Sequence, residues 1–277
     1  MRVDLHVHTT ASDGKLSPQE VVGKAFRDGV EVLSITDHDT LEGMERFTPE
    51  GIILIQGIIL IPGVEISSRF ERTLHILGYG FDPQNDVLRK TLSDLRRKRS
   101  VRNEMILDRA RSIGFELSME ELQEIAGNDV IGRPHFARLM VRKGYVSSYE
   151  EAFEKYLGKG KILYVEKERL KPERAIELIL KAGGIPVLAH PYQTGFEGEE
   201  LERFIKRLKG YGLKGIEVFY PEHTGRMMEE YLELSRKYDL LVTGGSDFHG
   251  EGTTLSSFGM DVPFLHIRRF LKELQIF

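Results

Sequence analysis

Length, composition and charge limit what this 277-residue chain can be. It has no cysteine, which excludes disulfides, cysteine-ligated zinc, cysteine-held iron–sulfur clusters and thiol catalysis. Its 39 Lys and Arg against 43 Asp and Glu give a formal charge of −4, which argues against a protein that coats nucleic acid by bulk charge.

Short β-branched runs alternate with helical patterns along most of the chain. One helix opens with a capping box at Ser17 and Glu20 and ends near Gly29, and another runs from Pro172 to Gly183. This alternation predicts an α/β fold with parallel strands, most simply a barrel. The predicted strands cover residues 3–7, 32–35, 58–61, 74–77, 185–189, 215–218 and 240–243.

The middle of the chain breaks this alternation. Residues 85–164 show helical patterns, with further capping boxes at Ser118 and Glu121 and at Ser147 and Glu150. We therefore expect a first barrel part at 1–84, a helical insertion domain at 85–164 and a second barrel part at 165–277.

Neither end of the chain nor its apolar runs indicate a membrane protein. The N-terminus carries charged and polar residues where a signal peptide has an apolar core. The longest apolar run, residues 52–66, is interrupted and falls short of the roughly 18–20 apolar residues of a membrane span. We expect a soluble, cytoplasmic protein.

The first predicted strand carries polar side chains on one face. Because side chains alternate along a strand, Asp4, His6 and His8 point one way while Leu5 and Val7 point the other. Two imidazoles at i and i+2 can share one cation, although a pair of ordinary histidines fits the same pattern.

Ligand-type residues recur at the ends of later strands. In parallel α/β folds these ends meet at the ligand-binding edge. The recurrence therefore predicts a centre that holds several metal ions, formed by His6, His8 and the further residues His38, Glu65, His75, His190, Asp247 and His249.

The series of motifs resembles the PHP (polymerase and histidinol phosphatase) family over essentially the whole chain. Within the insertion, Gly132-Arg133-Pro134-His135-Phe136-Ala137 is similar to the stand-alone nucleotide phosphatases and RNA-trimming exonucleases of that family. The family motifs are Asp4-x-His6-x-His8-Thr9, Ser12-Asp13-Gly14, Thr36-Asp37-His38-Asp39, Pro62-Gly63-Val64-Glu65, Ala189-His190-Pro191 and Gly245-Ser246-Asp247-x-His249.

The resemblance implies a distorted seven-stranded (β/α) barrel that holds two to three divalent metal ions. Nitrogen and oxygen ligands suit Zn, Mn or Fe. The implied ligands are His6, His8, Glu65 and Asp247 for the first ion, His75, His190 and the bridging Glu65 for the second, and Asp13, His38 and His249 for the third.

The expected chemistry is attack on phosphorus by a hydroxide that bridges two metals, since bound cations lower the pKa of water to around 7. Glu65, Asp37 and His249 are the candidate catalytic residues. Asp37 and Asp39 are either general acid or base groups or, as we favour, carboxylates that orient His38.

Three further residues are candidates for substrate binding. Arg133 and His135, in the insertion, can bind phosphate. The alternative is that they are ordinary surface charges at the start of a helix. His223 follows a barrel strand, at the end of the barrel where phosphate would bind. The basic run with Arg96, Lys98 and Arg99 fits either RNA contact or a solvated helix face, and interspersed acidic residues favour the second.

The first functional hypothesis is a phosphoesterase that releases phosphate from nucleoside 3′,5′-bisphosphates and also trims short RNA from its 5′ end. The alternatives are a phosphatase for another small monoester, such as histidinol phosphate, and a non-catalytic PHP module stabilised by metal. The expected partner is a small phosphorylated substrate, either a nucleotide or a short RNA end. We do not expect binding to a membrane.

Overall fold

The computed structural model describes residues 1–47, 50–127, 131–166, 168–251 and 257–276. The chain divides into two compact units, one made of residues 1–92 and 169–277 and the other of residues 93–168. We call them the barrel unit and the helical unit. The boundary between them falls inside α3 (Asp86–Ser112), eight residues beyond the start of the predicted insertion at residue 85.

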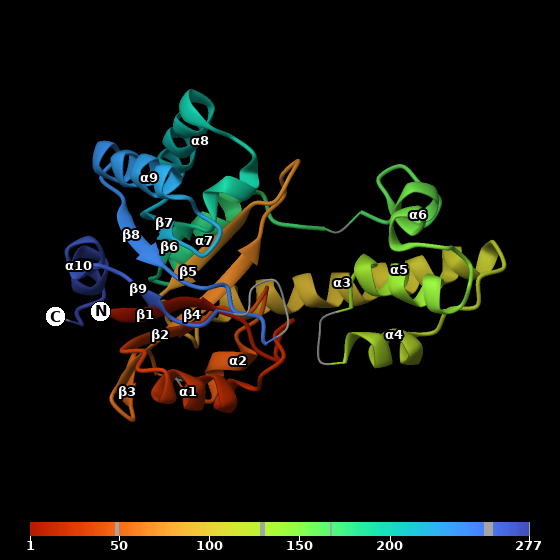
Figure 1. Ribbon diagram of the computed structural model, residues 1–277, viewed down its shortest axis with the longest axis horizontal. Helices are drawn as coiled ribbons and strands as arrows, with labels where there is room; N and C mark the ends of the chain where they lie inside the picture. Colours follow the sequence, from red (N-terminus) through yellow and green to blue (C-terminus); the bar gives the residue numbers. More distant parts are fainter. Residues whose placement is uncertain (48–49, 128–130, 167, 252–256, 277) are drawn as a thin grey trace. The chain divides into compact units, whose positions relative to one another are not determined.

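Seven strands of the barrel unit follow one another in the order β8, β7, β6, β5, β4, β2, β1, which confirms the predicted seven-stranded α/β barrel (Figure 1). A parallel bridge between Val7 and Phe248 joins β1 to the segment after β8, so the sheet nearly closes. The strands, including the unpredicted β3 and β9, are β1 (Arg2–Val7), β2 (Val32–Ile35), β3 (Ile53–Ile55), β4 (Ile58–Ser67), β5 (His75–Tyr79), β6 (Ile185–Leu188), β7 (Gly215–Phe219), β8 (Leu241–Gly244) and β9 (Met260–Asp261).

The expectation that all barrel strands run parallel is wrong for β5. β5 pairs antiparallel with both β4 and β6, whereas β1, β2 and β4, and likewise β6, β7 and β8, pair in parallel. Residues 68–74 join β4 to β5, and a connection this short can form a hairpin but not a crossover, which needs a dozen or more residues.

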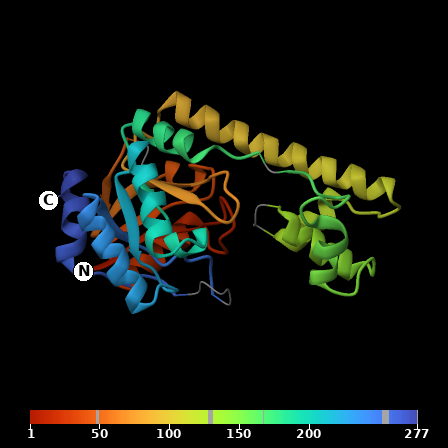
Figure 2. The same ribbon diagram turned by 90° about the horizontal axis from the view of Figure 1, so that it is seen from above.

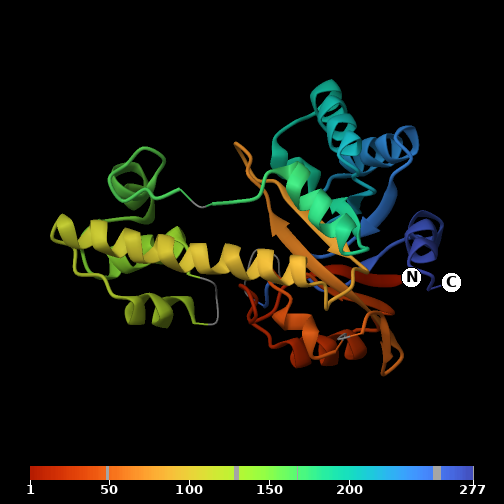
Figure 3. The ribbon, with the colours of Figure 1, turned by 180° about the vertical axis from the view of Figure 1, so that it is seen from behind.

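Helices cover the sheet of the barrel unit. The predicted capping box at α1 is present, with the Glu20 N–H donating to Ser17 Oγ and the Ser17 N–H donating to Glu20 Oε2. α7 packs on β5 and β6, and α9 packs on β7 and β8 (Figure 3). The helices of this unit are α1 (Pro18–Arg27), α2 (Glu42–Glu45), α7 (Pro172–Lys181), α8 (Gly198–Gly210), α9 (Gly225–Lys237) and α10 (Phe264–Glu273), with a 3-10 turn at Pro191–Thr194.

A buried apolar cluster holds the barrel strands together. Val3 and Leu5 of β1, Val187 of β6, and Ile267 and Phe270 of α10 belong to it, and all five are inaccessible to solvent. Burying one such side chain stabilises the fold by roughly 1.5–3 kcal/mol. The cluster therefore fixes the strands that carry the polar residues described below.

The helical unit is made of the later part of α3 and the helices that follow it (Figure 2). It contains its own apolar core, which includes Ile106 of α3 and Phe136 of α5. The capping box at Ser118 and Glu121 is present as predicted. The one predicted at Ser147 and Glu150 is wrong by one residue, because Ser148 caps α6 and accepts from the Glu151 N–H at 3.1 Å. The remaining elements are α4 (Met119–Ala126), α5 (Arg133–Arg142), α6 (Tyr149–Ala152) and a π-helical turn at Phe153–Leu157.

Among the described residues, no helix is both long and apolar enough to cross a membrane.

Candidate metal centre

The barrel unit brings the nine predicted metal ligands together. They lie on β1, β4 and β5 or in the segments that follow β1, β2, β6 and β8. Their donor atoms form four groups, within each of which all donor atoms lie within 4.8 Å of one another: His8, Asp13, His38 and His249; His6, His190 and Asp247; His6, His8 and Glu65; and His38, Glu65 and His75. The groups share members, so they form one continuous cluster.

Glu65 on β4 lies in the middle of this cluster and is 1% exposed. A carboxylate surrounded by imidazoles from several strands is placed to bridge two cations. Its two oxygens lie 2.8–3.3 Å from ring nitrogens of His6, His8, His38, His75 and His190.

Four buried atoms of the cluster form no well-aligned hydrogen bond among the described residues. They are Nε2 of His6, Nε2 of His8, Nδ1 of His38 and Oε2 of Glu65. Each lies close to an oppositely charged group: Nδ1 of His38 is 2.8 Å from Oε2 of Glu65, and Nε2 of His8 is 3.0 Å from Oδ1 of Asp247. Buried polar atoms normally have well-aligned hydrogen bonds, so four exceptions in one place need a reason. Divalent cations would satisfy all four, and nitrogen and oxygen donors suit Zn, Mn or Fe. The residues therefore fit a metal centre.

The electrostatics of the cluster favour positive charge. Burial lowers the pKa of His8, but the facing carboxylates of Asp247 and Glu65 outweigh burial and raise it to about 10. Burial raises the pKa of Glu65, but His75, His38 and His6 hold it well below its ordinary value. The negative charge gathered here attracts protons or metal ions.

The pKa of His75 is shifted in the opposite direction to those of His6, His8 and His38. Burial lowers its pKa to about 4, although Glu65 opposes this shift. Its imidazole is therefore neutral near pH 7 and can bind a cation without first losing a proton.

Glu217 of β7 supports the cluster, and sequence reasoning missed it. Its Oε1 lies 3.0 Å from Nδ1 of His6, and its Oε2 accepts from the backbone N–H of His190 at 2.8 Å. An Nδ1–H that donates to Glu217 leaves Nε2 of His6 free for a metal. The available signal was a carboxylate inside the otherwise apolar run Gly-Ile-Glu-Val-Phe, where Glu217 is fully buried.

Tyr220 orients the carboxylate of Asp247. Its hydroxyl donates to Oδ2 of Asp247 at 2.9 Å, while Oδ1 lies 3.0 Å from Nε2 of His8 and 3.3 Å from Nε2 of His6. One carboxylate oxygen is thus held by the protein, and the other faces the cluster.

Backbone strain coincides with the candidate ligands. His190 and Asp247 have φ angles of 22° and 53°, and Asp39 has 54°. Non-glycine residues rarely adopt positive φ, and such strain concentrates at functional sites. Gly245 allows the close approach of the Asp247 segment to β1, because a Cβ there would lie 2.4 Å from Cβ of His6.

Asp37 and Asp4 tie loops to the barrel. Asp37 accepts from the Thr9 N–H at 2.7 Å and from the hydroxyls of Thr9 and Ser12, so among the described residues its hydrogen bonds hold the loop before Asp13. The favoured role of Asp37 in orienting the His38 ring, and its alternative role as a general acid or base, stay predictions. Asp4 accepts from the N–H and hydroxyl of Ser246, next to Asp247.

The predicted substrate residues of the helical unit lie at the start of α5. Nη1 of Arg133 donates to the Leu157 carbonyl at 3.0 Å, and its guanidinium lies 5.0 Å from the ring centre of Tyr164. Nδ1 of His135 accepts from the Gly132 N–H at 3.0 Å. Substrate contact by Arg133 and His135 stays a prediction.

His223 lies in the barrel unit and is 5% exposed. Its Nδ1–H donates to the Val218 carbonyl at 2.8 Å, and its buried Nε2 has no partner among the described residues. Burial lowers its pKa, so the ring is neutral near pH 7 and Nε2 carries a lone pair. Its ring contacts those of Tyr220 and Tyr192, at centroid distances of 5.0 and 5.5 Å.

Comparison with known proteins identifies the family. The chain is 38% identical over 252 residues to a 5′-3′ exoribonuclease of Haemophilus influenzae, covering 90% of each chain. It is 34% identical over 262 residues to a 3′,5′-nucleoside bisphosphate phosphatase of Chromobacterium violaceum, covering 90% of this chain and 88% of that one. A solved structure, described as an amidohydrolase from Chromobacterium violaceum with bound sulfate and no metal, has a TM-score of 0.78 at 30% identity and covers 100% of this chain and 96% of that chain. The family model for the PHP domain matches residues 4–166, more than half of the chain, which therefore belongs to the PHP domain family.

Proposed function

We propose that this chain is a metal-dependent phosphoesterase that releases phosphate from nucleoside 3′,5′-bisphosphates and trims short RNA from its 5′ end. The observation that carries the proposal is the convergence of nine residues with nitrogen or oxygen donor atoms, four of which have a buried donor atom without a well-aligned hydrogen bond. The names of the two relatives support the substrate class.

The cluster holds two to three ions of Zn, Mn or Fe in this proposal. When bound, these ions supply positive charge for the phosphate oxygens and lower the pKa of water. Glu65 bridges two of the ions, and Glu217 fixes the ring of His6. The proposed ligands are the nine predicted ones: His6, His8, Asp13, His38, Glu65, His75, His190, Asp247 and His249.

The exposure of the ligands suggests the side from which substrate approaches. The side chains of His6 and His8 are inaccessible, whereas those of Asp13 and His249 are 32% and 20% exposed. The side chains of His38 and His75 are also partly exposed, at 16% and 21%. The phosphate would therefore meet the side of the cluster where Asp13, His38, His75 and His249 are exposed, and His249 is the proposed catalytic residue that contacts it.

The remaining phosphate contacts are proposed for His223, Arg133 and His135. The unpaired Nε2 of His223 accepts a hydrogen bond from a phosphate or sugar hydroxyl when the ring is neutral. The guanidinium of Arg133 suits paired contacts with phosphate oxygens.

Phosphate release from three substrates tests the proposal: adenosine 3′,5′-bisphosphate, histidinol phosphate and a short 5′-phosphorylated RNA. The protein is loaded with Zn, Mn or Fe, its metal content is measured, and Glu65→Gln serves as the inactive control. Turnover of the bisphosphate and shortening of the RNA are expected. Turnover of histidinol phosphate alone would favour a different monoester phosphatase, and no turnover by the fully metallated protein would favour a non-catalytic module.

A further inference from the structure

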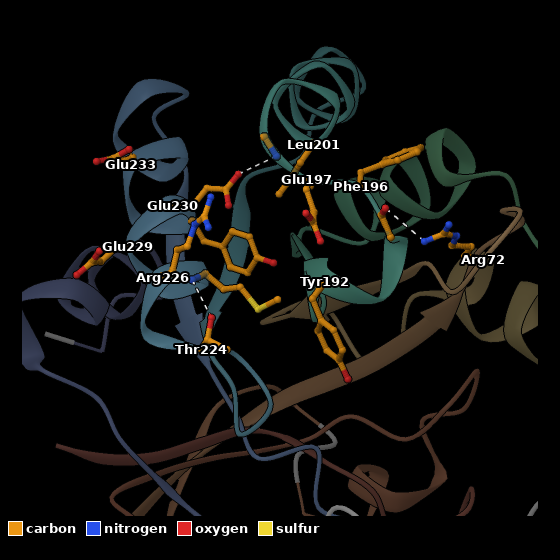
Figure 4. Close-up of a pocket in the computed structure, with 14 residues that line it drawn as sticks. Arg72, Tyr192, Phe196, Glu197, Leu201, Thr224, Arg226, Glu229, Glu230 and Glu233 are labelled. Carbon is orange, nitrogen blue, oxygen red and sulfur yellow. Dashed lines mark hydrogen bonds between the residues drawn. The ribbon is translucent and has the colours of Figure 1, made fainter.

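A second cavity lies in the barrel unit outside the ligand cluster (Figure 4). Its volume is about 650 Å³, within the roughly 300–1,000 Å³ of small-molecule sites. The 3-10 turn after β6, the start of α8 and the first turns of α9 form its walls, and Arg72 from the β4–β5 connection completes them.

This cavity adjoins the candidate metal centre. Tyr192 lines it and follows the proposed ligand His190 by two residues, and Arg72 lines it and precedes His75 by three. The Tyr192 ring lies 5.8 Å from that of Tyr220, whose hydroxyl holds Asp247. Tyr192 and Tyr220 therefore link the wall of the cavity to the ligand cluster.

The walls suit a flat, uncharged heteroaromatic group. Tyr192, Phe196 and Tyr231 offer aromatic surface, and bases stack on aromatic side chains. In Figure 4, Glu197 points into the cavity, whereas Glu229 points away from it.

The residues that line the cavity include four glutamates and two arginines, Arg72 and Arg226, and this excess of carboxylates disfavours a second phosphate there. Glu230 accepts a hydrogen bond from the Gly198 N–H at 3.1 Å. Its carboxylate therefore lies at the N-terminus of α8, where Glu197 also lines the cavity. Arg72 donates to the Gly195 carbonyl at 3.3 Å. Carboxylates accept from amino groups and repel phosphate, so the uncharged end of a nucleotide fits better than its anionic end.

We propose that this cavity binds the nucleobase of the substrate, with Glu197 accepting from the amino group of adenine, cytosine or guanine. This inference rests on the proposed function, since it assigns the base of the same nucleotide whose phosphate meets the metal centre. Such a site would make the enzyme specific for nucleotides rather than active on phosphate monoesters in general.

Kinetics with two substrates test the inference. They are adenosine 3′,5′-bisphosphate and its abasic analogue, which has hydrogen in place of the base. Met227→Trp narrows the cavity and is expected to raise KM for the nucleotide about tenfold, the scale of one lost stacking contact, with no change for the abasic analogue. Glu197→Gln is expected to raise the nucleotide KM about three- to tenfold, and its matched control Glu200→Gln, at an exposed position of α8 that does not line the cavity, to leave it unchanged.

Binding of adenosine alone, followed by saturation-transfer NMR, gives a readout that needs no hydrolysis. Wild-type protein should bind adenosine, and Met227→Trp should weaken that binding about tenfold. Equal effects of Met227→Trp on both substrates, or unchanged adenosine binding, would overturn the nucleobase site. Adenosine binding without hydrolysis of either substrate would instead overturn the proposed function while keeping the site.

Discussion

Replacing Glu217 with Gln should weaken metal binding without touching any proposed ligand. The wild-type carboxylate accepts twice, from Nδ1–H of His6 at 3.0 Å and from the N–H of His190 at 2.8 Å. Glutamine has only one side-chain oxygen, so its amide group must face one of these two donors.

Both orientations of the glutamine are unfavourable. If its NH₂ faces the backbone N–H of His190, two donors oppose each other in a fully buried place. If it faces His6, it favours the tautomer with the proton on Nε2, the atom that must bind the metal. Losing one hydrogen bond to a charged group costs about 1.5–3 kcal/mol, which corresponds to roughly 10- to 150-fold weaker metal binding.

Metal affinity is the direct assay. Protein is titrated with Zn or Mn in chelator-buffered solutions, and bound metal is measured by mass spectrometry alongside thermal unfolding and phosphate release. Glu200→Gln, an exposed site on α8, is the matched control. Wild-type affinity in the Glu217→Gln protein, with normal unfolding, would refute the role assigned to Glu217.

Four other outcomes are expected. Glu65→Gln should abolish turnover and lower the bound metal, and full turnover would remove Glu65 as the bridge. Tyr220→Phe should weaken metal binding by about 3- to 10-fold through loss of the hydrogen bond to Asp247, measured in the same titration. Arg133→Ala should raise KM for the bisphosphate with metal content unchanged, and identical kinetics would return Arg133 to ordinary surface charge. Because metal-free His8 has a pKa of about 10, adding Zn at pH 7.5 should release protons, measurable by calorimetry in buffers of different ionisation enthalpy.

The positions of the proposed ligands in the fold were predictable where strand periodicity governs them. His6 and His8 share a face of β1 because side chains alternate, and their burial next to apolar Leu5 and Val7 follows from that alternation. The ends of β2, β6 and β8 gave His38, His190 and Asp247 in the same way. A hydrophobic pattern indicates which residues face inward, so a polar residue at an inward-facing position is a candidate functional residue.

Features that depend on partners distant in sequence were not predictable. The reversed direction of β5 depends on the hairpin through residues 68–74, and an apolar run has the same pattern in either direction. Asp37 stands beside His38 in the chain, yet its hydrogen bonds go to Thr9 and Ser12, from a loop that precedes it by 25 or more residues. Adjacency in sequence therefore did not predict these hydrogen bonds.

The division between the buried and exposed parts of the cluster has a functional consequence. His6, His8 and Glu65 lie on or beside strands, are almost inaccessible, and are held by carboxylates or by one another. Asp13, His38 and His249 lie in loops and are partly exposed, as is His75 at the start of β5. In the proposed centre, the buried residues would set the positions of the ions, whereas the loops and the neighbouring cavity would set what reaches them. Enzymes that share this fold should therefore differ in substrate preference through residues of the loops and cavity walls, while the set of metal ligands stays the same.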